Sequence, residues 1–227
     1  MTQPGYDWKM PDAWTEETIA ALPDDGHRYE IFDGSLVISA PGDESHPGIQ
    51  GNLYARLWNA APEGWRIRTD LGLRLPSANL TPDIVVLKPD AVRGEEWTPV
   101  AGAALVVEIA SRSTQMNDRT SKPAFYAEAG IPAYWRIDRE GNLHVYELIN
   151  EGRYTITATV PPGERWSTRY PFPFALDPAE LSDRPDPADL HAPGQFGLPG
   201  RMKITLATPC RGPALAGAGP LVTVKRS

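Results

Sequence analysis

Two short apolar runs rich in β-branched residues lie in the middle of the chain. Residues 84–87 read IVVL and residues 105–107 read LVV, a length and composition typical of buried β-strands. An acidic residue flanks each run, because Asp83 directly precedes the first and Glu108 directly follows the second. A carboxylate at the edge of a buried strand needs a compensating charge, since desolvating an unpaired one costs several kcal/mol.

Other segments show helical or strand patterns. Asp33-Gly34 between two β-prone runs predicts a tight hairpin over residues 27–38. From His46, apolar residues recur at helical spacing at positions 49, 53, 57 and 58 and predict an amphipathic helix. Lys122-Pro123 opens another helix, which Gly130 ends. Strands are further predicted at 65–69, 71–75, 134–137, 143–148 and 154–160, a turn at 76–80, and short helices at 15–22 (capped by Asp12 or Thr15) and 178–181.

This order of elements predicts an α/β fold, with a mixed β-sheet flanked by helices and extra antiparallel hairpins. Residues 1–190 are expected to form one domain. Residues 191–227 are rich in Gly, Pro and Ala, show little periodicity, and are expected to be a poorly ordered tail.

Composition limits the cellular setting and the partners. The single cysteine, Cys210, rules out an intramolecular disulfide framework. No apolar run approaches the roughly 20 residues that span a bilayer, and the N-terminus lacks a signal-peptide core, so we expect a cytoplasmic protein without a membrane partner. Five cations and no acids lie beyond residue 194, so removing them from the net charge of −7 leaves −12 on residues 1–193. This balance argues mildly against a nucleic-acid partner.

The spacing of acids and lysine allows two interpretations. Asp83 and Glu108 on neighbouring strands, about 4.8 Å apart, could share a divalent cation, with the Ile109 carbonyl as a third ligand. Lys122 at the start of the next helix could then polarise the attacking water. Alternatively, Lys122 or Arg119 neutralises Glu108 in an ion pair, and Asp83 only caps a turn.

Other polar residues carry weaker signals. Glu30 lies in the first strand of the predicted hairpin, where a solvated side chain is an equally good interpretation. His46 begins a helix, where a lone histidine is more often structural than catalytic or ligating. Three arginines alternate along the strands at 65–75 and would line up on one face, either as a basic patch or as a solvated surface: Arg66, Arg68 and Arg74.

An ordered set of motifs between about Thr15 and Val160 resembles the Uma2-type restriction endonuclease-like proteins of the PD-(D/E)xK nuclease superfamily. The motifs are Tyr29-Glu30-Ile31, Asp33-Gly34, His46, Pro82-Asp83, Val107-Glu108-Ile109, Ser111, Asp118, Lys122, Tyr126, Gly130-Ile131-Pro132 and Tyr134-Trp135.

The resemblance implies a restriction-endonuclease-like core with Asp83 and Glu108 as metal ligands and Lys122 as the catalytic lysine. It also suggests Glu30 as an extra carboxylate near the metal and Asp118 as a partner of Lys122. One departure matters: Ala110 stands two residues after Glu108, where most superfamily members carry the lysine.

Two functions follow as expectations. The first is a Mg²⁺- or Mn²⁺-dependent endonuclease that hydrolyses DNA phosphodiester bonds, with a homodimer expected because nucleases that cut both strands often pair. The second is a catalytically inactive nuclease-fold protein that acts as a binding or interaction module. A metal-free hydrolase is poorly supported, because no Gly-x-Ser-x-Gly motif is present and Cys210 lies in the tail.

Overall fold

The computed structural model describes residues 11, 13–40, 46–94, 96–111, 120–149 and 152–182. The helices are α1 (Glu16–Ala20), α2 (His46–Ala60) and α4 (Ser121–Glu128), with 3₁₀ turns η1 (Val100–Gly102) and η2 (Pro178–Leu181). The strands are β1 (Arg28–Phe32), β2 (Ser35–Ser39), β3 (Arg66–Thr69), β4 (Leu73–Arg74), β5 (Ala78–Leu80), β6 (Ile84–Leu87), β7 (Thr98–Pro99), β8 (Ala103–Ile109), β9 (Ala133–Ile137), β10 (Leu143–Leu148), β11 (Tyr154–Val160), β12 (Trp166–Thr168) and β13 (Phe174–Leu176).

A six-stranded mixed sheet forms the centre of the molecule, in the order β11-β10-β9-β8-β6-β3. Its β8 and β9 pair in parallel, while the other neighbours pair antiparallel. The connection from β8 to β9 contains α4, which is the crossover that a parallel pair requires. The predicted mixed sheet flanked by helices is therefore confirmed.

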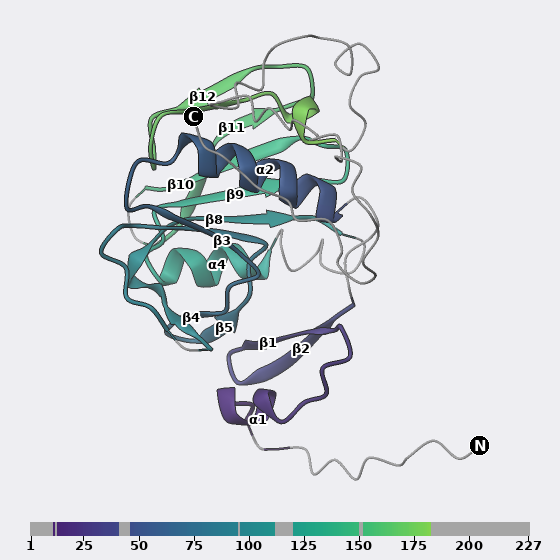
Figure 1. The fold of residues 1–227 in the computed structure, drawn as a ribbon. Helices are drawn as coiled ribbons and strands as arrows, with labels where there is room; N and C mark the ends of the chain where they lie inside the picture. The colour runs from purple at the N-terminus through teal and green to yellow at the C-terminus, as the bar shows by residue number, and fades with distance from the viewer. Residues whose placement is uncertain are drawn as a thin grey trace, which may run out of the picture.

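The six-stranded sheet is covered on both faces (Figure 1). On one face, Leu53 and Leu57 of α2 pack with Leu105, Val107 and other sheet residues, and with β13 and η2. On the opposite face, Tyr126 of α4 belongs to a second apolar cluster that also contains residues of a smaller sheet. Because side chains alternate along a strand, residues 105, 107 and 109 of β8 face α2, whereas residues 106 and 108 face α4.

The smaller sheet has the order β2-β1-β5-β4-β7 and brings the N-terminal hairpin to the core. Asp33 and Gly34 form its turn with φ of 49° and 74°, the left-handed conformation that a two-residue hairpin turn of this kind requires. Before it, Thr15 caps α1, with its side chain accepting from the Thr18 amide and the Thr18 hydroxyl accepting from the Thr15 amide. This hairpin carries Arg28 and Glu30 toward the larger sheet.

Several local predictions are wrong. Residues 76–80 do not form only a turn, because Ala78–Leu80 is strand β5 and pairs with β1 and β4. Trp58 is 52% exposed on the outside of α2 and stacks on Tyr54 instead of joining the core stripe. Arg74 does not share a face with Arg66 and Arg68, because β4 belongs to the smaller sheet, where Arg74 pairs with Glu16.

The boundary predicted at residue 190 and the tail 191–227 lie outside the described residues. Strands β12 and β13, which sequence periodicity did not indicate, form a hairpin that adds Phe174 and Leu176 to the core. In the part of the chain that the structure describes, no helix is long and apolar enough to cross a membrane.

Candidate active site

Asp83 and Glu108 lie side by side at the ends of two neighbouring strands. The β6–β8 register pairs Ile84 with Val107, so one further step places Asp83 opposite Glu108. Both are 1% exposed. The prediction that the two acids are adjacent is therefore confirmed.

The Asp83 carboxylate accepts hydrogen bonds from three directions. Arg28 donates from Nη1 to Oδ1 at 2.9 Å, and the Ile109 amide donates to Oδ2 at 2.6 Å. His46 Nε2 lies 3.2 Å from the same Oδ2. Burial alone would raise the pKa of Asp83, but His46, Arg28 and the Ile109 amide outweigh burial and hold this pKa below its usual value.

The acidic residues around Arg28 and His46 in turn raise the pKa of both side chains. Burial would lower the pKa of Arg28, yet the carboxylates of Asp83, Glu108 and Glu30 raise it. Burial would also lower the pKa of His46, but its hydrogen bond to Asp83 and the charge of that carboxylate raise it. The Asp83 carboxylate is thus held by the Arg28 guanidinium and by its contact with the His46 imidazole.

Glu108 and Glu30 meet at Lys122, on the opposite side of the cluster. Lys122 Nζ donates to Glu108 Oε1 at 3.1 Å and lies 3.2 Å from Glu30 Oε1, and the lysine is 1% exposed. The Tyr126 hydroxyl donates to Glu108 Oε1 at 2.6 Å. Lys122 and Tyr126 are four residues apart and therefore share one face of α4. Burial and the nearby Glu108 raise the pKa of Tyr126 well above its ordinary value, so it remains a donor.

Glu30 is fully buried, so the interpretation of a solvated strand residue is wrong. Its Oε1 accepts from the Thr81 amide at 2.8 Å, whereas Oε2 is buried with no hydrogen-bond partner among the described residues. The ion pair between Lys122 and Glu108, which the interpretation without a metal predicted, is present. Asp83 does more than cap a turn, because Arg28 and the Ile109 amide donate to its carboxylate. Asp118 and Arg119 lie outside the described residues, so their predicted contacts stay predictions.

Three residues of this network were not singled out from the sequence. Arg28 also binds Asp70, with 2.7 Å between Nη2 and Oδ1. Gln50 donates to Asp70 Oδ2 at 3.0 Å and to the Asp83 carbonyl at 2.8 Å. One signal was available for Arg28, since it stands two residues before Glu30 and therefore on the same face of β1.

The carboxylate oxygens of Asp83, Glu108 and Glu30 are the candidate ligands of the divalent cation that the resemblance implies. Within the described residues, no group of three or more His, Cys, Asp or Glu side chains is arranged to hold a metal ion. Mg²⁺ in phosphoryl-transfer sites is usually held by one or two carboxylates with water and phosphate oxygens, and the pair of Asp83 and Glu108 is of this kind. The orphaned Oε2 of Glu30 offers one more oxygen. These residues fit a small, hard divalent cation.

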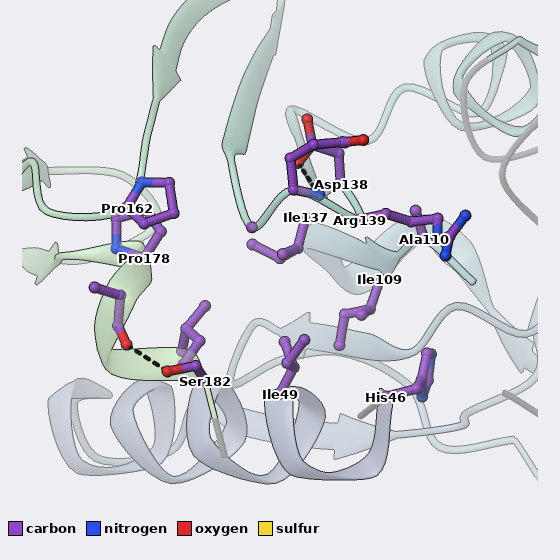
Figure 2. A pocket seen from close by; sticks show the side chains of 14 residues that line it. His46, Ile49, Ile109, Ala110, Ile137, Asp138, Arg139, Pro162, Pro178 and Ser182 are labelled. Carbon is purple, nitrogen blue, oxygen red and sulfur yellow. Dashed lines mark hydrogen bonds between the residues drawn. The ribbon is translucent and has the colours of Figure 1, made fainter. Parts of the chain in front are cut away.

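A groove of about 420 Å³ opens beside Asp83 (Figure 2). His46 and Ile109, which both contact the Asp83 carboxylate, line it together with Ile49 and Ile137. Figure 2 shows His46 and Ile49 on α2 facing Ile137 and Asp138 across the groove, with Pro162 and Pro178 at the other end. The remaining lining residues are Ala110, Arg139, Glu140, Gly141, Ala179, Leu181 and Ser182. The groove has a largely apolar floor, and His46 and Ile109 connect it to Asp83, which does not itself line it.

A mixed sheet with acids at its strand ends and a lysine on the crossover helix defines a restriction-endonuclease-like fold. The family model "Uma2: Putative restriction endonuclease" matches residues 16–180, which is more than half of the chain. The chain belongs to the Uma2 family.

One solved structure is similar in fold. The crystal structure of a putative nuclease belonging to DUF820 from Anabaena variabilis matches with a TM-score of 0.60 and 19% sequence identity. The match covers 73% of this chain and 95% of that chain. No curated protein matches the chain.

Proposed function

We propose that this chain is a metal-dependent endonuclease that hydrolyses DNA phosphodiester bonds at a PD-(D/E)xK-type site. The observation that carries the proposal is the convergence of Asp83, Glu108 and Lys122, from β6, β8 and α4, in one buried cluster. Membership in a family described as restriction endonucleases and the fold shared with a nuclease support it.

Asp83 and Glu108 would hold Mg²⁺ or Mn²⁺, with the Ile109 carbonyl as a third ligand. The ion would supply Lewis-acid stabilisation of the charge that builds up on the phosphate oxygens. In the reaction, a water oxygen bonds to phosphorus, the bond from phosphorus to one ester oxygen breaks, and that oxygen takes up a proton that comes from the water.

The protein's own side chains prepare the site for this reaction. Lys122 would place a fixed positive charge and N–H donors beside the reacting phosphate, and its ion pair with Glu30 keeps the ammonium in position. Arg28 and the Ile109 amide fix the orientation of the Asp83 carboxylate. His46 lies between Asp83 and the groove, so it would orient the carboxylate where the nucleic-acid strand enters.

The test is cleavage of supercoiled plasmid and of single-stranded DNA with Mg²⁺ or Mn²⁺. Near-isosteric variants Asp83→Asn, Glu108→Gln and Lys122→Met should each lose about 100-fold or more in rate, the usual loss when one electrostatic contact to the transition state is removed. Glu147→Gln on the exposed part of β10 removes one acid elsewhere and should cut like wild type.

The other outcomes separate the alternatives. If wild type is inert but calorimetry shows Mn²⁺ binding that Glu108→Gln abolishes, the metal site is real and DNA is the wrong substrate. If wild type neither cuts nor binds metal, the carboxylates serve the ion-pair network alone. The chain would then act as a binding or interaction module. The ion pairs of Asp83 with Arg28 and of Glu108 with Lys122 favour this second function.

A further inference from the structure

Arg136 is a buried cation without an anionic partner in the part of the chain that the structure describes. It lies in β9, is 5% exposed, and its Nε is buried with no hydrogen-bond partner. Its terminal guanidinium nitrogens make no hydrogen bond or ion pair to described residues and are not among the buried atoms, so the tip of the side chain reaches solvent.

The sheet places Arg136 directly beside the candidate active site. In the parallel β8–β9 ladder Arg136 is the register partner of Glu108, so the two residues lie about 4.8 Å apart on the same face of the sheet. That face carries α4, because Tyr134, two residues earlier in β9, contacts the Tyr126 ring. Arg136 therefore extends the row of charged residues that begins with Asp83 and Glu108.

Neighbouring acids are already engaged by other groups. Glu108 accepts from Lys122 and Tyr126. Asp138 accepts from Asn142 and contacts His144, which stands opposite Arg136 on β10. A guanidinium that is largely withdrawn from water and lacks an anion is unfavourable, unless a ligand supplies the anion during function.

We propose that Arg136 binds a phosphate group, through charge-assisted hydrogen bonds from its guanidinium tip, next to the Glu108–Lys122 pair. The planar fork of arginine matches the oxygens of a phosphate, which a lysine reproduces only as a point charge. On the proposed function, on which this inference rests, that group is a backbone phosphate of the nucleic acid at or beside the bond that is cut. Arg136 is then a substrate-binding residue in addition to the metal-binding acids and the lysine.

Stability of the free protein gives the first test. If Arg136 were a structural residue, Arg136→Met would lower the Tm. If Arg136 serves to bind a ligand, the opposite result is expected. The methionine variant loses the buried charge and keeps an apolar side chain of similar length, so its Tm should equal or exceed that of wild type. Arg153→Met changes an exposed arginine just before β11, outside the groove, and is the matched control. A clearly lower Tm for Arg136→Met overturns the proposal.

Phosphate binding gives the second test and does not depend on cleavage. Inorganic phosphate and a short single-stranded oligonucleotide are titrated separately into wild type, Arg136→Met, Arg136→Lys and Arg153→Met, with binding followed by calorimetry. Arg136→Met should weaken binding by about 10- to 100-fold, the range expected for losing a charge-assisted hydrogen bond. Arg136→Lys should recover part of this affinity, and Arg153→Met should bind like wild type.

The same variants separate this inference from the proposed function. If wild type does not cut DNA but binds the oligonucleotide through Arg136, the nuclease proposal fails and the phosphate site stands. If wild type binds inorganic phosphate through Arg136 but does not bind the oligonucleotide, the phosphate site stands and its ligand is free phosphate. If wild type cuts DNA and Arg136→Met cuts with an unchanged KM and kcat, the nuclease proposal stands and the inference about Arg136 is wrong.

Discussion

Lys122 is the residue on which the candidate site depends most. Its ammonium lies within 3.2 Å of carboxylate oxygens from two strands, Glu30 on β1 and Glu108 on β8, and all three side chains are buried. Removing one partner of a buried ion pair costs far more than the pair contributes, because the remaining charge stays desolvated.

Lys122→Met should therefore destabilise the fold by about 3–5 kcal/mol, the usual cost of breaking a buried pair. Urea unfolding followed by circular dichroism measures the change. Lys88→Met, which removes a partly exposed lysine just after β6, is the control and should change the free energy of unfolding by less than about 0.5 kcal/mol. A loss below about 1 kcal/mol for Lys122→Met would show that the two glutamates do not depend on this cation.

The residues of the site differ in how readily the sequence predicts them. Asp83 and Glu108 were predicted because they directly flank apolar strand runs, where a carboxylate needs a compensating charge. Lys122 was predicted from its place at the start of a helix. Arg28 was missed because its partner Asp83 lies 55 positions later, and its spacing to Glu30 does not show which acid it contacts on the other sheet.

Among the elements, the β8–α4–β9 unit determines the position of the site. It brings Glu108 to a strand end and returns the chain through α4, with Lys122 and Tyr126 facing that acid. The turn between β9 and β10 then forms one wall of the groove. Asp138 holds this turn, since it accepts from the Asn142 and Glu140 amides at 2.7 and 3.1 Å and contacts His144 Nε2 at 2.7 Å.

Asp138→Ala should destabilise the protein by about 1–3 kcal/mol near neutral pH, since it removes hydrogen bonds to a charged acceptor. Burial would raise the pKa of Asp138, but Asn142 and His144 outweigh burial and lower it. Its contribution is therefore present above the unfolded-state pKa of about 3.9 and is lost as the pH falls through the lower folded-state pKa.

Thermal unfolding from about pH 6 down to about pH 3 tests this dependence. The difference in Tm between wild type and Asp138→Ala should shrink at the acidic end. Glu140→Ala, which changes an exposed acid in the same turn, should show no such trend. A Tm difference that grows on acidification would contradict the assigned direction of the pKa shift.

The strands of the central sheet were predictable, whereas three short strands outside it were not. Residues 84–87, 105–109 and 143–148 show clear apolar patterns and form strands of the central sheet. Strands β5, β12 and β13 have three residues each, too few for alternation to be recognised, and they exist because partner strands supply their hydrogen bonds.

At the scale of the whole molecule, charge is distributed unevenly along the sequence. The stretch beyond residue 190 carries five cations and no acids, while the remainder carries −12. If the chain binds DNA, cations in this stretch should contribute an electrostatic attraction that does not depend on base sequence.

A chain that ends at Leu190 should keep the Tm of the full chain and bind DNA more weakly, with a shallower dependence of log Kd on log salt. Fluorescence anisotropy with a labelled duplex at several salt concentrations measures both quantities. A full-length chain with the five cations replaced by glutamine should behave like the shortened one. A large fall in Tm on shortening would contradict the predicted domain boundary.

Lys122 joins the five-stranded sheet to the six-stranded sheet, through Glu30 on one side and Glu108 on the other. The same ammonium that would serve the chemistry is thus part of what holds the architecture together. Selection for folding alone is therefore expected to retain this lysine in descendants of the family that have ceased to cut nucleic acid. In such lineages, Arg136 should be free to drift to an apolar residue first, because its loss leaves the fold intact.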